Sequence, residues 1–481
     1  MVVAQPDIAV GARDAMAESR STTRQVLHAV VDSRRVRCAF QPLIDLDSGA
    51  VAGYEALARG PRGSELESPL DLFAAAEEVG RMPELDWICR ASALEAAAAA
   101  GLDRGLSWFV NVEPGALRYP CPSDLAGVIA KACEGLRVVV EFAERRIGED
   151  PAGLLAAAQR VRKAGFGVAV DDVGAEPDSL ALLPFIQPDV VKLDMSLLHG
   201  RSRAHVAAVA NGVRAYAEAT GAVILAEGIE TPTHERAARV LGATYGQGWL
   251  YGRPGPLPER AAAVVKPFPL YQAPTDEEDG TPFSLTREHF HVARTSKELL
   301  LPMSRHLEDQ ATVGGQSVAL IGCFQEARFY TPRTRRRYSE LSERSVFTAA
   351  LAAGLRHDSS SRVLSIDLSG DDPLVEEWNV VVVGPHFAGA LLARDTGNSA
   401  PDMQREFDYV ITHDRTVVLR AARRLLRWMV PERGDDLGYP LSDPWPLAQG
   451  RQDLVVAQSH REQITALDHS GNDRTQREAV G

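Results

Sequence analysis

The chain has 481 residues, of which 45 % are hydrophobic and 24 % charged, and its formal net charge is −13. This length exceeds one compact core, so two or three domains are expected, and the acidic balance disfavours binding to nucleic acid polymers. A nucleotide substrate would then need metal ions or local arginines. Five cysteines without a CxxC pair, no signal peptide and no long apolar segment predict a cytoplasmic protein without a membrane span.

Ahead of the first apolar run, residues 1–36 are expected to form a loose arm and a short amphipathic helix at Ser21–Arg35. From residue 37 to 262, short apolar runs alternate with longer helical segments. The runs are Cys38–Ile44, Val51–Leu57, Leu106–Val112, Leu136–Phe142, Gly167–Val170, Val190–Leu193, Ala222–Ala226 and Ala243–Leu250. The helical segments include Leu70–Val79, Leu85–Ala100, Leu154–Ala164 and Ala204–Thr220.

This alternation predicts an α/β fold in which helices surround a parallel sheet, and eight strands favour a closed (β/α)8 TIM-like barrel. The first two runs are separated only by Asp45–Ala50, which contains Ser48 and Gly49. Such a short gap is typical of a hairpin, so one barrel strand should be antiparallel.

Beyond the barrel, residues 263–287 are rich in Pro, Asp, Glu and Gly, which predicts a linker. Residues 288–430 predict a smaller α/β domain. Its strands are expected at Ser317–Phe324, Val363–Leu368, Val380–Val383, Gly389–Ala393 and Phe407–Ile411, and its helices near Ala293–Gln310, Arg333–Leu341 and Arg415–Met429. The polar residues 431–481 are expected to be a disordered tail.

Polar side chains follow six of the predicted barrel strands. They are Glu55, Asn111, Glu141, the pair Asp171 and Asp172, Lys192 with Asp194, and Glu227. Because the carboxyl ends of barrel strands meet at one rim, these groups would repel one another unless divalent cations lay between them. Oxygen ligands suit Mg²⁺ or Mn²⁺, and two such ions can clamp a phosphodiester during hydrolysis. Lys192 would neutralise phosphate charge or orient the nucleophile.

The alternative for any one of these positions is a structural role. A single acidic residue after a strand is most often a helix cap or a solvated loop residue, and Asp171-Asp172 before Gly174 would alone be an ordinary turn. Repetition on successive strands favours the metal site instead.

The same residues resemble a known family. Tyr54–Arg59 reads YEALAR and contains the signature that names EAL domains. Further matching motifs are Phe40-Gln41-Pro42, Val110-Asn111, Glu141–Glu144, Asp171–Gly174, Val191–Asp194, Ala226–Glu230 and Tyr245–Gly248. The resemblance covers the whole predicted barrel and implies a phosphodiesterase that linearises cyclic di-GMP to pGpG with two Mg²⁺ or Mn²⁺ ions.

The resemblance also implies residue roles. The metal ligands would be Glu55, Asn111, Glu141, Asp171, Asp172, Glu227 and Gln247. Glu227 would assist proton transfer and Lys192 would hold the attacking water, so that Glu55, Lys192 and Glu227 form the catalytic set. Gln41 and Arg59 would bind the substrate, Arg59 through a phosphate. Glu144 would anchor the loop after the fifth strand, which couples metal binding to dimerisation in the family.

That loop departs from the family pattern. Val173 stands where the family has Phe, Glu176 takes a Gly position, and Pro177 stiffens the turn. The departure bears on turnover, on regulation and on the homodimer that the resemblance implies. An alternative function is therefore a non-catalytic cyclic di-GMP receptor that signals to a protein partner. A barrel hydrolase for another phosphodiester is a third reading.

In the second domain, Ser317–Phe324, Phe329–Pro332 and Arg335–Tyr338 resemble the sensory domain called DICT. The resemblance implies a signal-input role for an unknown ligand. The basic run Arg333–Arg337 could indicate nucleic acid binding, but it is also typical of a solvated first helical turn that begins with Thr331 and Pro332. We expect the second interpretation, because one short basic run in an acidic chain releases few counterions.

Overall fold

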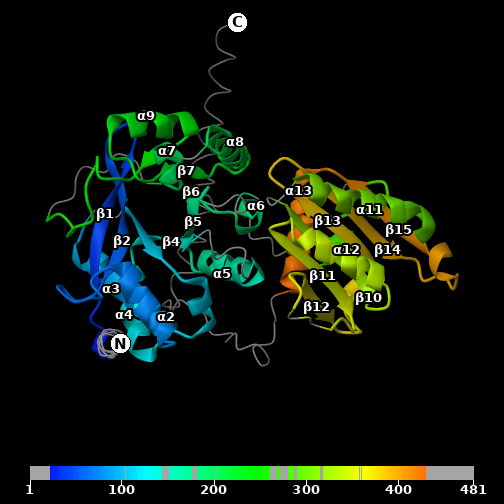
Figure 1. Cartoon of the computed structure of the whole chain (residues 1–481), viewed down its shortest axis with the longest axis horizontal. Helices are drawn as coiled ribbons and strands as arrows, with labels where there is room; N and C mark the ends of the chain where they lie inside the picture. Colours follow the sequence, from blue (N-terminus) through cyan, green and yellow to red (C-terminus); the bar gives the residue numbers. More distant parts are fainter. Residues whose placement is uncertain are drawn as a thin grey trace, which may run out of the picture.

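The computed structural model describes residues 22–259 except 103–104, 144–150, 176–179, 181 and 201, then 268–270, 280–286, 290–314 and 318–429 except 357 and 359. The predicted arm, the tail and most of the predicted linker lie outside these residues. Residues 22–32 are helical, in agreement with the expected leading helix. Two bodies follow, a barrel and a separate sheet domain (Figure 1).

The first body is a closed eight-stranded barrel, as predicted. Its strands are β1 (Arg37–Asp45), β2 (Val51–Arg59), β3 (Ser107–Asn111), β4 (Arg137–Ala143), β5 (Gly167–Val173), β6 (Val190–Leu193), β7 (Val223–Ala226) and β8 (Tyr245–Gly246), which neighbour one another in that order. Strand β1 is antiparallel to β2 and β8, and the other pairs are parallel. The hairpin turns at Gly49, whose φ of 72° suits glycine.

The helices of this body are α2 (Pro69–Glu78), α3 (Met82–Ala99), α4 (Ser123–Cys133), α5 (Pro151–Lys163), α6 (Leu183–Ile186), α7 (Ser196–His199), α8 (Arg203–Thr220) and α9 (Pro232–Leu241). Their ends follow local sequence signals. Thr231 caps α9 by accepting a hydrogen bond from the His234 amide, and Gly242 ends that helix at a φ of 101°. None of the helices described has the length and hydrophobicity needed to cross a lipid bilayer.

A small interior core fills one end of the barrel, and part of the expected linker belongs to it. Phe268 is 1 % exposed and joins Val190, Val223 and Tyr245 in this core. Its ring stacks on Tyr245 with 4.2 Å between centroids, and its carbonyl oxygen accepts a hydrogen bond from Arg137 Nη2 at 2.8 Å. Phe268, within the predicted linker, thus packs into the barrel, because an apolar ring beside an open barrel end gains free energy by burial.

The second body is a seven-stranded sheet in the order β12-β11-β10-β13-β14-β15-β9. In chain order its elements are β9 (Ala293–Ser296), α11 (Lys297–Gly314), β10 (Ala319–Glu326), α12 (Pro332–Ser342), β11 (Phe347–Ala353), β12 (Leu364–Leu368), β13 (Glu377–Val383), β14 (Ala388–Asp395), β15 (Glu406–Thr412) and α13 (Arg415–Arg427). The predicted helix near Ala293–Gln310 thus begins too early, because Ala293–Ser296 pairs with β15 as an edge strand. Strand β11 was not predicted, since its alanines have weak strand propensity.

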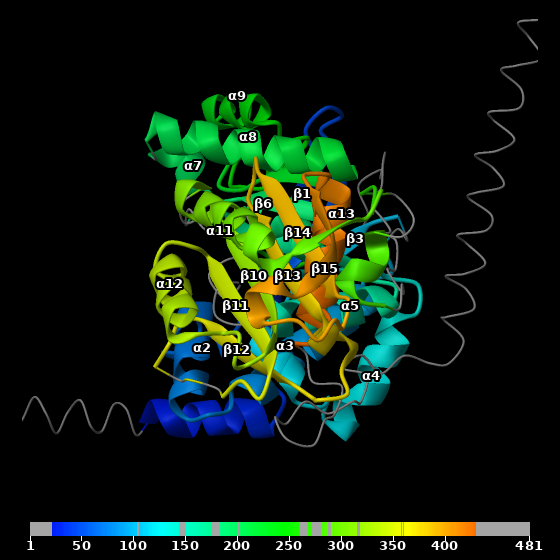
Figure 2. The same ribbon diagram turned by 90° about the vertical axis from the view of Figure 1, so that its right-hand side faces the viewer.

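Side chains of the sheet alternate between two hydrophobic cores. From β10, Leu320 and Phe324 join the core with α11 and α12, whereas Ile321 and Cys323 join the core with α13 and the barrel. Helix α13 contacts α5 and α6 and lies between the sheet and the barrel (Figure 1). Figure 2 shows the same arrangement with the sheet domain in front of the barrel.

Candidate metal centre

The side chain of Lys192 on β6 is at the centre of acidic residues that come from β2, β4, β5 and the segment after β7. Its Nζ atom lies 2.7 Å from Glu227 Oε1, 2.8 Å from Glu141 Oε1, 2.8 Å from Asp171 Oδ1 and 3.3 Å from Glu55 Oε2. Lys192 and Glu141 are both fully buried. The barrel therefore brings together acids from β2, β4 and β5 and from the end of β7, as the strand-end pattern predicted.

Two consecutive aspartates reach this cluster because β5 is irregular. Successive side chains of a regular strand point to opposite faces, so Asp171 and Asp172 would diverge. The β5–β6 register shifts between Val170 and Val173, and Asp172 has a φ of 59°. Aspartate tolerates this left-handed conformation, which is uncommon for other side chains. Both carboxylates consequently face the same group of acids.

The acids form two groups that share one residue. Ligand atoms of Glu55, Glu141 and Asp171 lie within 4.8 Å of one another, and so do those of Asp171, Asp172 and Glu227. An arrangement of this kind could hold cations at two adjacent positions. In addition, Glu141 Oε2 is buried without a hydrogen-bond partner among the described residues. The donor set therefore fits hard divalent cations, which prefer carboxylate oxygens.

Burial and mutual repulsion disturb the ionisation of this cluster. Burial raises the pKa of Glu141 well above its usual range, and the neighbouring Glu55 raises it further, against the opposing effect of Lys192. Burial and then Asp171 raise the pKa of Glu227 in the same way. For Lys192, burial lowers the pKa, but the surrounding carboxylates outweigh it and raise the pKa well above the usual value. Lys192 is therefore an ammonium ion.

Two amide side chains donate hydrogen bonds to Glu55, and a third lies behind one of them. Asn111 Nδ2 donates to Glu55 Oε1 at 3.0 Å, and Gln247 Nε2 donates to Glu55 Oε2 at 2.6 Å. Gln247 Nε2 is also 3.1 Å from Gln41 Oε1. The oxygen of Gln247 is buried without a hydrogen-bond partner in the described part of the chain, so it is free to accept from a cation or a ligand. Gln41 thus lies next to the cluster rather than in it.

A cavity of about 610 Å³ opens beside the cluster, a volume typical of ligand sites. Glu55, Asn111 and Asp171 line it on the barrel side, and residues of α2 and α3 form the opposite wall. Arg59 lines the same cavity, and its Nη1 donates to the Ala58 carbonyl at 2.8 Å. The predicted phosphate-binding arginine therefore shares one cavity with the acids.

The cavity wall also contains a buried ion pair that was not predicted. Asp86 and Arg90 on α3 pair with each other, and Asp86 Oδ1 accepts a hydrogen bond from the Glu113 amide at 2.9 Å. Burial raises the pKa of Asp86, while Arg90 opposes the change. The sequence contained one signal that could have predicted this pair. Asp86 and Arg90 are oppositely charged residues four positions apart in an otherwise apolar helical segment.

Two predicted features can be placed only in part. Glu144 and the loop residues 176–179 lie outside the described residues. Val173 is buried, and Gly174, with a φ of 97°, lies so close to Leu197 and Val209 that a side chain there would collide with them. The start of the altered loop is therefore tightly packed.

Comparisons with known proteins match both bodies of the structure. The family model of the EAL domain matches residues 23–254, and the model of DICT, a sensory domain in diguanylate cyclases and two-component systems, matches residues 283–396. A probable cyclic di-GMP phosphodiesterase of Escherichia coli is 29% identical over 240 residues, which are 47% of this chain and 44% of the relative. A cyclic di-GMP phosphodiesterase of Pseudomonas aeruginosa is 30% identical over 229 residues, 46% of this chain and 38% of the relative.

Among solved structures, a manganese and cyclic di-GMP complex of a Klebsiella pneumoniae protein shares 30% identity at a TM-score of 0.40, covering 46% of this chain and 56% of that one. The chain spans less than half the length of the curated relatives that it matches.

Proposed function

Because residues 23–254 belong to the EAL domain family and residues 283–396 to the DICT family, we propose that this chain hydrolyses cyclic di-GMP to linear pGpG under the control of its C-terminal sensory domain. The observation that carries the proposal is the pair of acidic groups that share Asp171 around Lys192. Relatives named as cyclic di-GMP phosphodiesterases support the choice of substrate.

Two Mg²⁺ or Mn²⁺ ions would be held by Glu55, Asn111, Glu141, Asp171, Asp172, Glu227 and Gln247. When bound, such ions supply Lewis acidity to a phosphodiester and lower the pKa of a water molecule. Five carboxylates and Lys192 carry a net charge of −4 when all are ionised, which two divalent cations would balance. The raised pKa of Glu141 and of Glu227 indicates how strongly the cluster favours added positive charge.

The remaining steps fall to side chains of the chain itself. Lys192 is protonated, so it cannot act as a base, and its N–H groups would orient the attacking water and the phosphate. Glu227, whose carboxyl lies 2.7 Å from Lys192 Nζ, would accept or return a proton during cleavage. Arg59 would position a phosphate at the cavity, and Gln41 would contact the nucleotide.

Control by the sensory domain would pass through α6, which follows the altered loop after β5. Arg423 on α13 donates from Nη2 to the Pro184 carbonyl at 2.9 Å, and the oxygen of the Gln187 amide, turned toward Arg423, lies 2.6 Å from the same nitrogen. Leu426 and Ile321 face Phe185 and other apolar residues of α5 and α6. A shift of α13 would therefore move the segment that continues from Asp171 and Asp172.

The second candidate function is a non-catalytic receptor that binds cyclic di-GMP and signals to a protein partner. The observation that favours it is the altered loop, with Val173, Glu176 and Pro177 in place of the family pattern. Formation of a homodimer and a cytoplasmic location stay predictions.

The test is incubation of the purified chain with cyclic di-GMP and Mg²⁺ or Mn²⁺, with pGpG followed by chromatography. We expect product that EDTA abolishes and that Glu55→Ala lowers by at least about 100-fold. Glu95→Ala, which removes an exposed acid of α3, is the matched control and should keep the activity. Tight nucleotide binding by calorimetry without any product would favour the receptor instead.

A further inference from the structure

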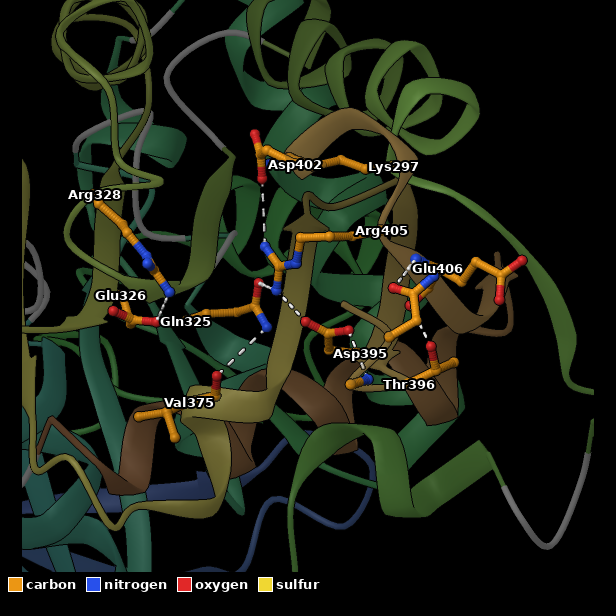
Figure 3. Close-up of polar contacts among 12 residues, drawn as sticks. Lys297, Gln325, Glu326, Arg328, Val375, Asp395, Thr396, Asp402, Arg405 and Glu406 are labelled. Carbon is orange, nitrogen blue, oxygen red and sulfur yellow. Dashed lines mark hydrogen bonds and ion pairs between the residues drawn. The ribbon is translucent and has the colours of Figure 1, made fainter. Parts of the chain in front are cut away.

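The sensory domain contains two cavities that share the side chains of Gln325 and Phe329. The larger one, of about 860 Å³, lies between the ends of β10, β14 and β15. Its arginines are paired with acids: Arg328 with Glu326, and Arg405 with Asp395. Figure 3 shows these pairs and the contact of Arg405 Nη2 with Gln325 Oε1, which is 3.0 Å long. Because these arginines already pair with carboxylates, the larger cavity is poorly suited to bind an anion.

The smaller cavity, of about 350 Å³, has a different charge balance. It lies between α11, α12 and the sheet, and five cationic side chains but only two carboxylates line it. The cations are Lys297, Arg305, Arg333, Arg336 and Arg337. A positive site of this kind stands out in a chain whose net charge is −13.

Three of these five cations form ion pairs within the described part of the chain. Lys297 pairs with Asp402 at 2.7 Å, Arg336 with Glu340 at 3.0 Å, and Arg337 with Glu308 at 3.0 Å. Arg305 and Arg333 make no ion pair and no side-chain hydrogen bond with any residue that the structure describes. They are therefore available to an anionic group of a ligand.

Aromatic side chains form a second part of the cavity lining. Phe324, Trp378 and Phe407 line it from β10, β13 and β15, and the rings of Trp378 and Phe407 meet edge to face with 5.6 Å between centroids. Phe329 stands at the border with the larger cavity. Such walls favour a flat ring system, because aromatic pairs gain about 0.5–1.5 kcal/mol beyond simple burial.

The backbone at the cavity is also unusual. Gln325 has a φ of 64°, although it is not a glycine, and the β10–β11 register shifts between Cys323 and Glu326. Its side chain is 5 % exposed and lines both cavities. Non-glycine residues in this conformation cost free energy and concentrate at ligand sites and active sites.

We propose that the smaller cavity is the input site of the sensory domain and binds a small aromatic anion, with its ring against Phe324 and Trp378 and its carboxylate or phosphate on Arg305 and Arg333. The site lies on the face of the sheet opposite α13, so the strands that hold the ligand also pack against the helix that contacts the barrel. Binding itself is independent of the proposed hydrolysis, and it is measured separately from activity.

The experiment measures binding to the full-length chain by calorimetry with three matched probes. These are 1-naphthaleneacetate, 1-naphthyl phosphate and the neutral 1-naphthaleneacetamide. We expect at least one of the two anions to bind saturably and at least about 10-fold more tightly than the amide. The anion that binds better identifies the natural head group as carboxylate or phosphate.

The variant Arg305→Gln/Arg333→Gln should lose about 10-fold or more in affinity for the anion while its binding of the amide stays unchanged. Arg344→Gln, which alters an exposed arginine outside the cavity, is the matched control and should bind like the unmodified chain. The variants change exposed or half-buried side chains, and thermal unfolding checks that they fold. Absence of saturable binding by every probe, equal affinity for acid and amide, or full affinity in the double variant would overturn the proposal.

Discussion

In both the barrel and the sensory domain, a buried ionisable side chain lies against groups of opposite sign. Lys192 in the barrel contacts four carboxylates, whereas Glu308 in the sensory domain pairs with the single guanidinium of Arg337. The acids around Lys192 exceed its charge, so the barrel keeps an unbalanced negative site. Glu308 pairs with Arg337, whereas Arg305 and Arg333 line the same cavity without an ion pair among the described residues. The comparison teaches that the sign of the unpaired charge around a buried ion predicts the ligand. Excess negative charge predicts a cation, and excess positive charge predicts an anion.

The variant expected to have the largest effect is Lys192→Met, which tests whether this lysine compensates the carboxylates of the barrel site. The change leaves several carboxylates buried without their cation, and removal of one partner of a buried ion pair typically costs about 3–5 kcal/mol. We expect a loss of that size in the free energy of unfolding in EDTA, measured with urea, and a fall in pGpG formation of about 100-fold or more. Added Mn²⁺ should restore part of the stability by mass action. Lys163→Met, at an exposed position of α5, is the control, and equal stability of the two variants in EDTA would contradict the assignment.

A second test concerns the packed end of the barrel opposite the acids. Phe268→Ala should lower the free energy of unfolding by about 3–5 kcal/mol, because it empties the interior core between Tyr245 and Phe109. Phe268→Leu keeps most of the volume and should cost less than about 1.5 kcal/mol. Urea unfolding of both variants measures the difference, and similar stabilities would show that the ring does not support the barrel.

The pH dependence of stability tests the sensory half. Burial raises the pKa of Glu308 to about 7 in the folded chain, while Arg337 opposes the change. The unfolded chain releases this proton near its ordinary pKa of 4.5, so the contribution of Glu308 to stability is greatest below that pH and is lost as the pH rises through about 7. Between these pH values, ionisation of Glu308 should lower the free energy of unfolding by about 3 kcal/mol. Glu308→Gln should flatten the curve of unfolding free energy between pH 4.5 and 7, whereas Glu340→Gln, exposed on the cavity rim, should leave it unchanged.

The smallest effect concerns the link between the two halves. Arg423→Ala removes the hydrogen bond to Pro184 and should cost about 1.5–3 kcal/mol in unfolding free energy. If α6 carries the control signal, the rate of pGpG formation should also lose its response to the ligand of the sensory domain, although the ligand still binds. Arg203→Ala, on the exposed side of α8, controls for loss of charge. An unchanged response in Arg423→Ala would move the coupling elsewhere.

The sequence predicted the barrel site well because one simple rule applied to it. Each acid directly follows a short apolar run of the sequence, and a closed barrel brings such positions to the same rim. The rule could not predict that Lys192 contacts four carboxylates at once, which depends on the diameter of the barrel. Nor could it predict that a left-handed Asp172 turns its carboxylate toward Asp171, since that conformation depends on local pairing with β6.

The sensory domain was predicted less completely for a related reason. Its cavity is built from side chains of β10, β13, β15, α11 and α12, which are far apart in the sequence and share no repeating position. The pairing of β9 with β15 is likewise a long-range contact that local propensity does not encode. The docking of α13 on α6 depends on surface shape, and only the structure shows it.

The burial of Phe268 means that the barrel, as a packed unit, extends beyond the end of its family match in the sequence. The EAL match ends at residue 254, yet the ring that closes the barrel comes from the segment leading to the sensory domain. A chain cut after residue 262 would lack this ring and expose the core around Tyr245. Exchange of sensory domains between such proteins would therefore preserve the barrel only where the incoming piece begins after Leu270, or brings an equivalent aromatic residue of its own.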